Sequence, residues 1–299
     1  MSDRELASIL AELSPPFDVE RPTRQTSPVV FCSPHSGRIY PRTFLEESQL
    51  DPLALRRSED CYVDELLASV PAFGAPLLAA RFPRAYLDVN REPYELDPEL
   101  FDEPLPEFAN AQTMRVVGGL GTIARIVAEN EQIYSGPISL DSAYARIDHL
   151  YKPFHATLRD LLEQTRAQFG YAILIDCHSM PSASTNYPAA VRPAFVIGDR
   201  YGTSCGARIT RSLRDILRLQ GHHAQLNRPY AGGFITEYYG RPNHAIHAVQ
   251  IEINRGLYLN EGSLARSEAF CRFLQIMTEI IERIVVQLPA AVESRAAAE

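Results

Sequence analysis

Two histidines and one glutamate stand within or directly after short apolar runs of this sequence. His35 follows the run PVVFC, His178 follows the run AILIDC, and Glu252 lies inside a third run, HAVQIEI. Two neutral imidazoles and one carboxylate can bind a zinc ion and leave a position open for water. A separate glutamate can take the proton of that water and later pass it to a leaving amine. These residue types therefore predict metal-assisted hydrolysis.

No acidic residue follows His35 at the short spacing that would identify the carboxylate ligand. A His-x-x-Glu pattern would identify it, but the residue three after His35 is Arg38. The nearest acidic candidates are Glu59 and Asp60, in the segment RSEDCYVDEL. Either residue could complete a metal site, or it could simply stabilise the first turn of a helix that starts there.

Short apolar segments bounded by turn residues predict buried strands, because their length and β-branching are typical of strands rather than helices. The segments are Pro28–Cys32, Pro76–Ala79, Tyr86–Val89, Ala172–Cys177, Ala194–Gly198 and His247–Ile253. Apolar residues spaced by three and four positions predict helices. The helices are Glu59–Val70, Ala145–Phe169, Gly206–Leu219 and Ser263–Gln287.

This alternation of strands and helices predicts the fold class α/β, a single domain with a mixed, mostly parallel sheet flanked by helices on both faces. We expect the domain to cover residues 28–289, after a lead-in at 1–27 and before a frayed tail at 290–299. Sites in such folds lie just beyond the carboxyl ends of the strands. Strand alternation also predicts that Gln250 and Glu252 point to the same face of the last strand.

Composition narrows the possible partners. The 299 residues include 29 Lys and Arg against 37 Asp and Glu, a formal net charge of −8, and they contain no basic run. We therefore expect no nucleic acid partner, whereas a small anionic substrate can still be held by a few local arginines. The sequence shows neither a membrane-spanning apolar run nor a signal peptide, and its five cysteines lack CxxC spacing. We accordingly expect a cytoplasmic protein with no membrane partner.

A series of longer motifs resembles one enzyme family. The motifs are SPHSG, RSEDCYVDEL, RAYLDVNREP, DCHSMP, NRPYAGG and QIEINRGLY, in this order between about His35 and Tyr258. Together they resemble the N-formylglutamate amidohydrolase (deformylase) family, which is related to zinc carboxypeptidase-like and aspartoacylase-like hydrolases. The resemblance implies a zinc carboxypeptidase-like fold. It also implies one bound Zn²⁺ and cleavage of N-formyl-L-glutamate to formate and L-glutamate, late in histidine degradation.

The same resemblance implies roles for particular residues. It makes His35 and His178 zinc ligands, and we place the acidic ligand at Asp60, with Glu59 as the alternative. Glu252 is implied as general base and acid, and Arg84 as the residue that faces the oxyanion. Asn90 and Arg91 are implied to hold a substrate carboxylate. Because glutamate has two carboxylates, we add Arg255 as a substrate-binding candidate, with the backbone of Gly232 and Gly233 allowing close approach.

Three other functions remain possible at this point. The enzyme could act on another N-acyl amino acid, or the chain could be a binding module that keeps the cleft without catalysis. A metal-independent Cys–His hydrolase could use Cys177 or Cys61. Cys177 precedes His178, and neighbours in an extended segment point to opposite faces, so we expect Cys177 to pack in the core instead. Glu252 could also be only the structural partner of a buried arginine.

Overall fold

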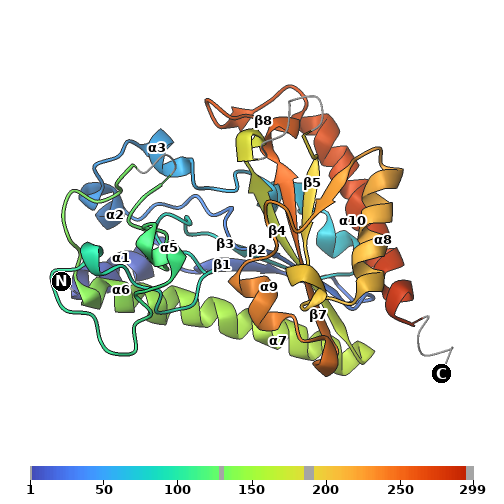
Figure 1. Cartoon of the computed structure of the whole chain (residues 1–299), viewed down its shortest axis with the longest axis horizontal. Helices are drawn as coiled ribbons and strands as arrows, with labels where there is room; N and C mark the ends of the chain where they lie inside the picture. Colours follow the sequence, from blue (N-terminus) through green and yellow to red (C-terminus); the bar gives the residue numbers. More distant parts are fainter. Residues whose placement is uncertain (1, 128–130, 185–191, 294–299) are drawn as a thin grey trace. The chain divides into compact units, whose positions relative to one another are not determined.

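The computed structural model describes every residue except 1, 128–130, 185–191 and 294–299 (Figure 1). Contacts divide the chain into two compact units. The first unit is Met1–Asp18, Pro34–Cys61 and Ala79–Thr157, and the second is Val19–Ser33, Tyr62–Leu78 and Leu158–Glu299. The predicted boundaries at residues 28 and 289 stay a prediction. Across the residues that the structure describes, no helix is both long and apolar enough to cross a membrane.

The strands form one seven-stranded sheet in the order β1-β3-β2-β4-β7-β5-β6. Their bounds are β1 Phe17–Glu20, β2 Val29–Ser33, β3 Leu77–Ala80, β4 Ala172–Met180, β5 Phe195–Gly198, β6 Ala224–Leu226 and β7 Ile246–Asn254. β2, β4 and β7 run parallel to one another, whereas β5 runs antiparallel to β7 and parallel to β6. The predicted mixed, mostly parallel sheet is therefore confirmed. A short hairpin follows, formed by β8 Leu259–Asn260 and β9 Ala265–Arg266.

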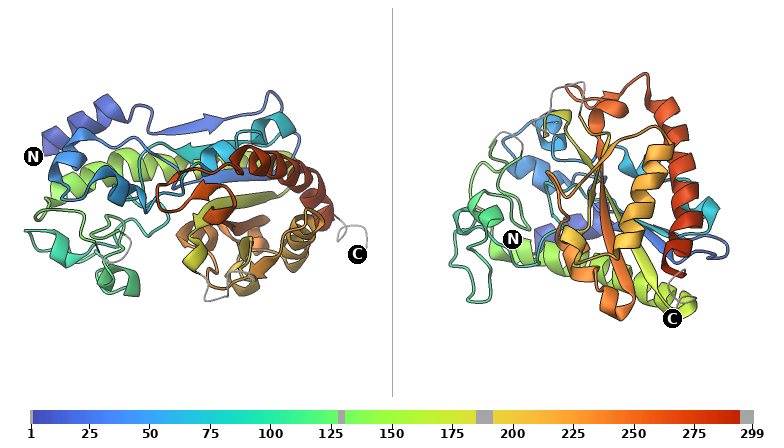
Figure 2. Two further views of the ribbon diagram at one scale, coloured as in Figure 1. Left: turned by 90° about the horizontal axis from the view of Figure 1, so that it is seen from above. Right: turned by 45° about the vertical axis from the view of Figure 1, so that its right-hand side comes forward.

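Helices precede, separate and follow these strands along the chain. The α-helices are α1 Ser2–Glu12, α2 Arg42–Glu47, α3 Pro52–Arg56, α4 Val63–Leu66, α5 Met114–Val117, α6 Leu140–Arg146, α7 Lys152–Phe169, α8 Ala207–Leu219, α9 Phe234–Tyr239 and α10 Phe270–Glu293. Shorter helical turns are η1 Val70–Phe73, η2 Pro98–Leu100, η4 Ile147–Tyr151, η5 Ser182–Ser184, η7 Arg200–Gly202, η8 Pro242–His244 and η9 Arg255–Leu257. In the second unit, α8 and α10 lie side by side (Figure 2), on the opposite side of the sheet from α9 (Figure 1).

The two faces of the central strands differ in polarity. β4 and β7 are nine residues each, and their register pairs Asp176 with Gln250 and His178 with Glu252. These four side chains share one face because residues two apart in a strand point the same way. The opposite face of β7 carries Val249, Ile251 and Ile253, which are all buried. The predicted alternation in the last strand is thus confirmed.

Two predicted elements differ from the structure. Tyr86–Val89 is a turn rather than a strand, because the amides of Tyr86 and Leu87 both donate to the carbonyl of Pro83. Such local bonds replace the ladder that a strand would need. The predicted helix Glu59–Val70 is also interrupted, because Tyr62 has a φ of 64°, a conformation that a right-handed helix does not contain.

The carboxyl-terminal prediction also needs adjustment. The helix expected over Ser263–Gln287 begins only at Phe270, since the hairpin of β8 and β9 lies before it, and it continues to Glu293. The expected frayed tail therefore overlaps α10 at its start, and residues 294–299 lie outside the described residues.

Candidate active site

The loop after β2 holds His35 against a second loop of the first unit. A Cβ placed on Gly37 would lie 2.1 Å from the carbonyl oxygen of Phe82, so only glycine allows this approach. The amide of Ile39 donates to the carbonyl of Arg81 over 3.0 Å. The backbone thereby brings His35 beside the turn that contains RAYLDVNREP.

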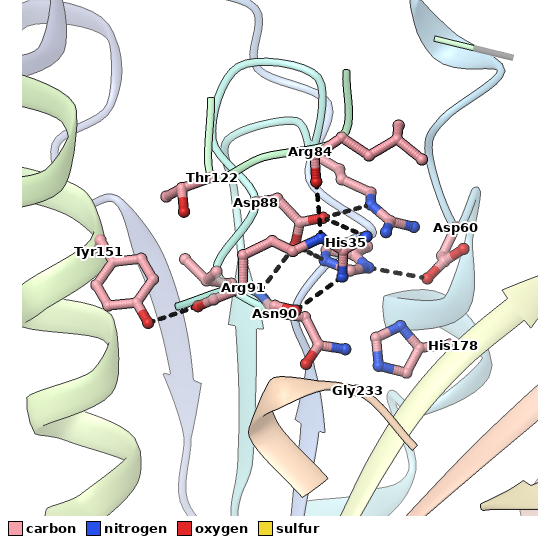
Figure 3. A network of polar contacts seen from close by, with 12 residues as sticks. His35, Asp60, Arg84, Asp88, Asn90, Arg91, Thr122, Tyr151, His178 and Gly233 are labelled. Carbon is pink, nitrogen blue, oxygen red and sulfur yellow. Dashed lines mark hydrogen bonds and ion pairs between the residues drawn. The ribbon is translucent and has the colours of Figure 1, made fainter. Parts of the chain in front are cut away.

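Asp88 links most of the polar groups in this part of the site (Figure 3). Its Oδ1 accepts hydrogen bonds from Nε2 of His35 at 2.7 Å and from the amide of Asn90 at 2.8 Å. Its Oδ2 accepts from Nε of Arg84 at 2.9 Å and lies 3.6 Å from Nη2 of Arg91. Burial alone would raise the pKa of Asp88, but Arg84, Arg91 and His35 together hold it well below the usual value. Asp88 is therefore ionised at neutral pH and orients both a metal-ligand candidate and an arginine.

Arg91 is committed largely to the main chain. Its Nε donates to the carbonyl of Leu120 at 3.0 Å and its Nη1 to the carbonyl of Asn90 at 2.9 Å. Tyr151 in turn donates to the carbonyl of Arg91 at 2.7 Å (Figure 3). Burial lowers the pKa of Arg91 to about 10, so its guanidinium stays charged at neutral pH. The substrate-binding roles expected for Asn90 and Arg91 stay predictions.

The structure separates the two acidic candidates. The amide of Asp60 donates to the carbonyl of His35 at 2.9 Å, and Oδ2 of Asp60 lies 3.5 Å from Nδ1 of the same histidine. Glu59 belongs to another cluster, in which it accepts from the hydroxyl of Tyr40 at 2.6 Å and pairs with Arg56 at 3.1 Å. Asp60 does not cap α4 either, since Tyr62 occupies that position. Of these two candidates, Asp60 is therefore the one that lies beside His35.

In the second unit, the polar face of β4 and β7 carries the remaining candidates. Nε2 of His178 lies 3.0 Å from Oδ1 of Asp176, and the hydroxyl of Thr236 in α9 donates to Oδ2 of Asp176 at 3.2 Å. Glu252 is 7% exposed and accepts a hydrogen bond from Nε2 of Gln250 at 2.8 Å. Because Glu252 and His178 are register partners, their side chains stand next to each other on one face.

Three further substrate-binding candidates flank this face. Gly232 has a φ of 115°, a left-handed conformation that favours glycine, and the amide of Gly233 donates to Oε1 of Gln250 at 2.7 Å. Arg255 is buried, and its Nε donates to the hydroxyl of Ser179 at 3.0 Å. The roles expected for Gly232, Gly233 and Arg255 toward a substrate stay predictions.

The donor set suits a zinc ion. His35, Asp60 and His178 each offer one ligand atom, and these atoms all lie within 4.8 Å of one another. Two ligands of a tetrahedral zinc site are separated by about 3.3 Å, close to the 3.5 Å between His35 and Asp60. Nε2 of His35 bonds to Asp88, which leaves its Nδ1, 3.5 Å from Asp60, to face a metal, as is usual for carboxylate–histidine–metal triads.

Sequence reasoning did not assign a role to Asp176 or Asp88. Asp176 stands two residues before His178 in a strand, a spacing that puts both on one face, so its role could have been inferred from alternation. Asp88 lies between two arginines, which marks it only as a possible ion-pair partner. Its contact with His35 depends on two loops that are distant in sequence.

The cysteines do not form a nucleophilic site. Cys177 is buried, as expected, and lies on the face of β4 opposite to His178. Burial and the nearby Asp176 raise its pKa well above the usual value, so the thiol stays protonated at neutral pH. Cys61 is also buried, and its thiol donates to Glu59 at 3.2 Å. The geometry therefore disfavours a Cys–His hydrolase.

Replacing Asp88 by asparagine is expected to lower the free energy of unfolding by about 3 kcal/mol or more, because positive groups then lose a buried partner. The folded-state pKa of Asp88 lies below the unfolded value. Its contribution is therefore present above about pH 4 and is lost as the pH falls through the folded pKa. Urea unfolding of the wild type and the variant, from pH 7 down to about pH 2, measures both effects.

The exposed pair of Asp148 with Lys152 provides the matched control. Asp148→Asn should change the free energy of unfolding by less than about 1 kcal/mol. Equal effects of the two substitutions at pH 7 would contradict the central role of Asp88.

Comparisons with known proteins agree with the motifs. The family model described as N-formylglutamate amidohydrolase matches residues 27–259. N-formylglutamate deformylase of Pseudomonas putida is 27% identical over 237 residues, which cover 78% of this chain and 82% of that protein. The enzyme of the same name from Pseudomonas aeruginosa is 28% identical over 239 residues, covering 78% and 83%.

A solved structure extends the match to almost the whole chain. The crystal structure of N-formylglutamate amidohydrolase from Ralstonia eutropha JMP134 superposes with a TM-score of 0.84 at 33% identity. The match covers 94% of this chain and 99% of that one. With its motifs in order, its sheet and the family model over most of its length, this chain belongs to the N-formylglutamate amidohydrolase family.

Proposed function

We propose that this protein hydrolyses the N-formyl amide of N-formyl-L-glutamate to formate and L-glutamate in a metal-dependent reaction. The observation that carries the proposal is the grouping of ligand atoms from His35, Asp60 and His178 within 4.8 Å in a chain of this family. The names of the two Pseudomonas relatives and of the Ralstonia structure support the substrate.

Zn²⁺ is the metal that this donor set favours, since two imidazoles and one carboxylate leave a fourth position open. When bound, the ion would act as a Lewis acid that polarises the formyl carbonyl and lowers the pKa of water. Asp88 would accept the Nε2–H of His35, which fixes the tautomer of this ring and raises the basicity of its Nδ1.

Glu252 and Arg84 would carry out the acid–base and electrostatic parts of the reaction. Glu252 takes one proton from the attacking water, whose oxygen forms a bond to the formyl carbon. Arg84 stabilises the negative charge that develops on the formyl oxygen, and its contact with Asp88 holds the guanidinium in place. Glu252 then delivers the proton to the amide nitrogen as the carbon–nitrogen bond breaks.

The two carboxylates of the glutamate part require positive or amide donors. The family resemblance assigns one carboxylate to Asn90 and Arg91. Arg255 is our further candidate, with the backbone of Gly232 and Gly233 allowing close approach. Both arginines are buried, and a guanidinium can bind a carboxylate through two parallel charge-assisted hydrogen bonds. Operation in histidine degradation follows from the same resemblance, and the cytoplasmic location is the expectation drawn from the sequence; both belong to this proposal.

Formate release tests the function directly. Purified enzyme is expected to prefer N-formylglutamate over N-formylaspartate and over N-acetylglutamate by about tenfold or more in kcat/KM, since one methyl or methylene changes binding by about 1–3 kcal/mol.

A chelator should abolish the activity and added Zn²⁺ should restore it, whereas Cys177→Ala should stay active. Inhibition by thiol alkylation without any effect of the chelator would instead support the Cys–His hydrolase. If the enzyme preferred another N-acyl amino acid, the proposed substrate would be wrong, but the proposed metal-dependent amide hydrolysis would stand.

A further inference from the structure

Gln250 is a buried polar residue to which the reaction outlined above assigns no role. Its side chain is 4% exposed, and both ends of its amide form hydrogen bonds. Oε1 accepts from the amide of Gly233 at 2.7 Å, and Nε2 donates to Oε1 of Glu252 at 2.8 Å. Gln250 therefore connects the start of α9 to the glutamate that would transfer the proton.

The orientation of the Gln250 amide is determined by its surroundings. A backbone N–H can only donate, so the atom that faces Gly233 must be the oxygen. The NH₂ group is thereby directed toward Glu252, where it finds a carboxylate that can only accept. Gly232, with a φ of 115°, forms the turn that leads the chain into the Gly233 amide.

The neighbouring strand repeats the arrangement. Asp176 and Gln250 are register partners. Asp176 lies 3.0 Å from His178, and Gln250 donates to Glu252, so each contacts the residue two positions further along its own strand. Thr236 holds Asp176 at 3.2 Å just as Gly233 holds Gln250. Residues at the start of α9 thus bind Asp176 and Gln250. These two side chains in turn contact His178 and Glu252, respectively.

We propose that Gln250 is the positioning residue for Glu252, and that the Gly232–Gly233 turn serves to hold its amide. This inference rests on the proposed function, because it requires Glu252 to act as general base and acid. The hydrogen bond restricts the rotamers of the Glu252 side chain and holds its carboxylate on the strand face that it shares with His178.

Two substitutions of Gln250 distinguish its hydrogen bond with Gly233 from its hydrogen bond with Glu252. Gln250→Glu keeps an oxygen for the Gly233 amide but replaces the donor to Glu252, whereas Gln250→Met removes both bonds at similar length. Both variants should lower kcat by about tenfold or more while KM changes much less, the pattern of a misplaced catalytic group. In the Glu252→Gln background, Gln250→Met should lower kcat almost no further. If Gln250 acts through Glu252, the effects of the two substitutions on kcat are not additive.

Gln220 offers a matched control, since it donates to Glu279 at 3.0 Å in an exposed position at the end of α8. Gln220→Met is expected to leave kcat unchanged. Wild-type kcat in Gln250→Glu, or a full additional loss in the double variant, would overturn the inference.

Amide exchange of Gly233 tests the geometry without any activity assay. Its exchange should accelerate in Gln250→Met, which lacks the acceptor, and stay at the wild-type rate in Gln250→Glu. Unchanged exchange in Gln250→Met would overturn the inference whatever the enzyme does. If exchange behaves as expected but the wild-type enzyme releases no formate, the proposed function has failed and the placement of Gln250 by α9 still stands.

Discussion

The Glu252→Gln enzyme is expected to keep its metal and to bind N-formylglutamate normally, but to turn it over at least about a hundredfold more slowly. Glutamine has the same shape as glutamate but cannot take a proton from water or return one to the leaving nitrogen. Glu252 is 7% exposed and stands beside His178 in the strand register. Steady-state formate release, together with zinc content by atomic emission, measures the two halves of this prediction.

A surface glutamate serves as the control for this substitution. Glu237 in α9 is 61% exposed at its side chain and pairs with Arg200, so Glu237→Gln should retain wild-type kcat. If Glu252→Gln also kept near-normal turnover, Glu252 would have no part in proton transfer. The structural alternative, a buried glutamate that only satisfies its neighbours, would then be the better description.

Replacing His178 by alanine is expected to release the metal and with it the activity. A tetrahedral site that loses one of three protein ligands retains too few donors to compete with water. Zinc content after dialysis should fall far below one ion per chain, and the apparent metal affinity should weaken by more than the roughly 10–100-fold typical of outer-sphere substitutions. His35→Ala should behave in the same way.

His247 provides a control in the same sheet. It lies near the start of β7, and its Nδ1 accepts a hydrogen bond from the amide of Gly206 at 3.3 Å. His247→Ala should therefore keep the zinc content of the wild-type protein. Full zinc content in His178→Ala would remove this histidine from the ligand set and, with it, the basis of the metal-dependent mechanism.

The sequence alone was sufficient for the central strands and for the residues that they carry. Apolar runs of β-branched residues predict β2, β4 and β7, and the period of two in a strand places Glu252 on the face of Gln250. The motifs were specific enough to identify the family, which the family model then confirmed. These features are local, since they depend on neighbours within a few residues along the chain.

The tertiary structure alone decided which acidic residues accompany the histidines. Glu59 and Asp60 are adjacent, and no periodicity distinguishes them; the bond from the Asp60 amide to the carbonyl of His35 turns one toward the imidazole and leaves the other with Tyr40. Asp88 reaches His35 because Gly37 lets two distant loops touch. Such choices arise from contacts between segments far apart in the chain, and local propensity contains no information about them.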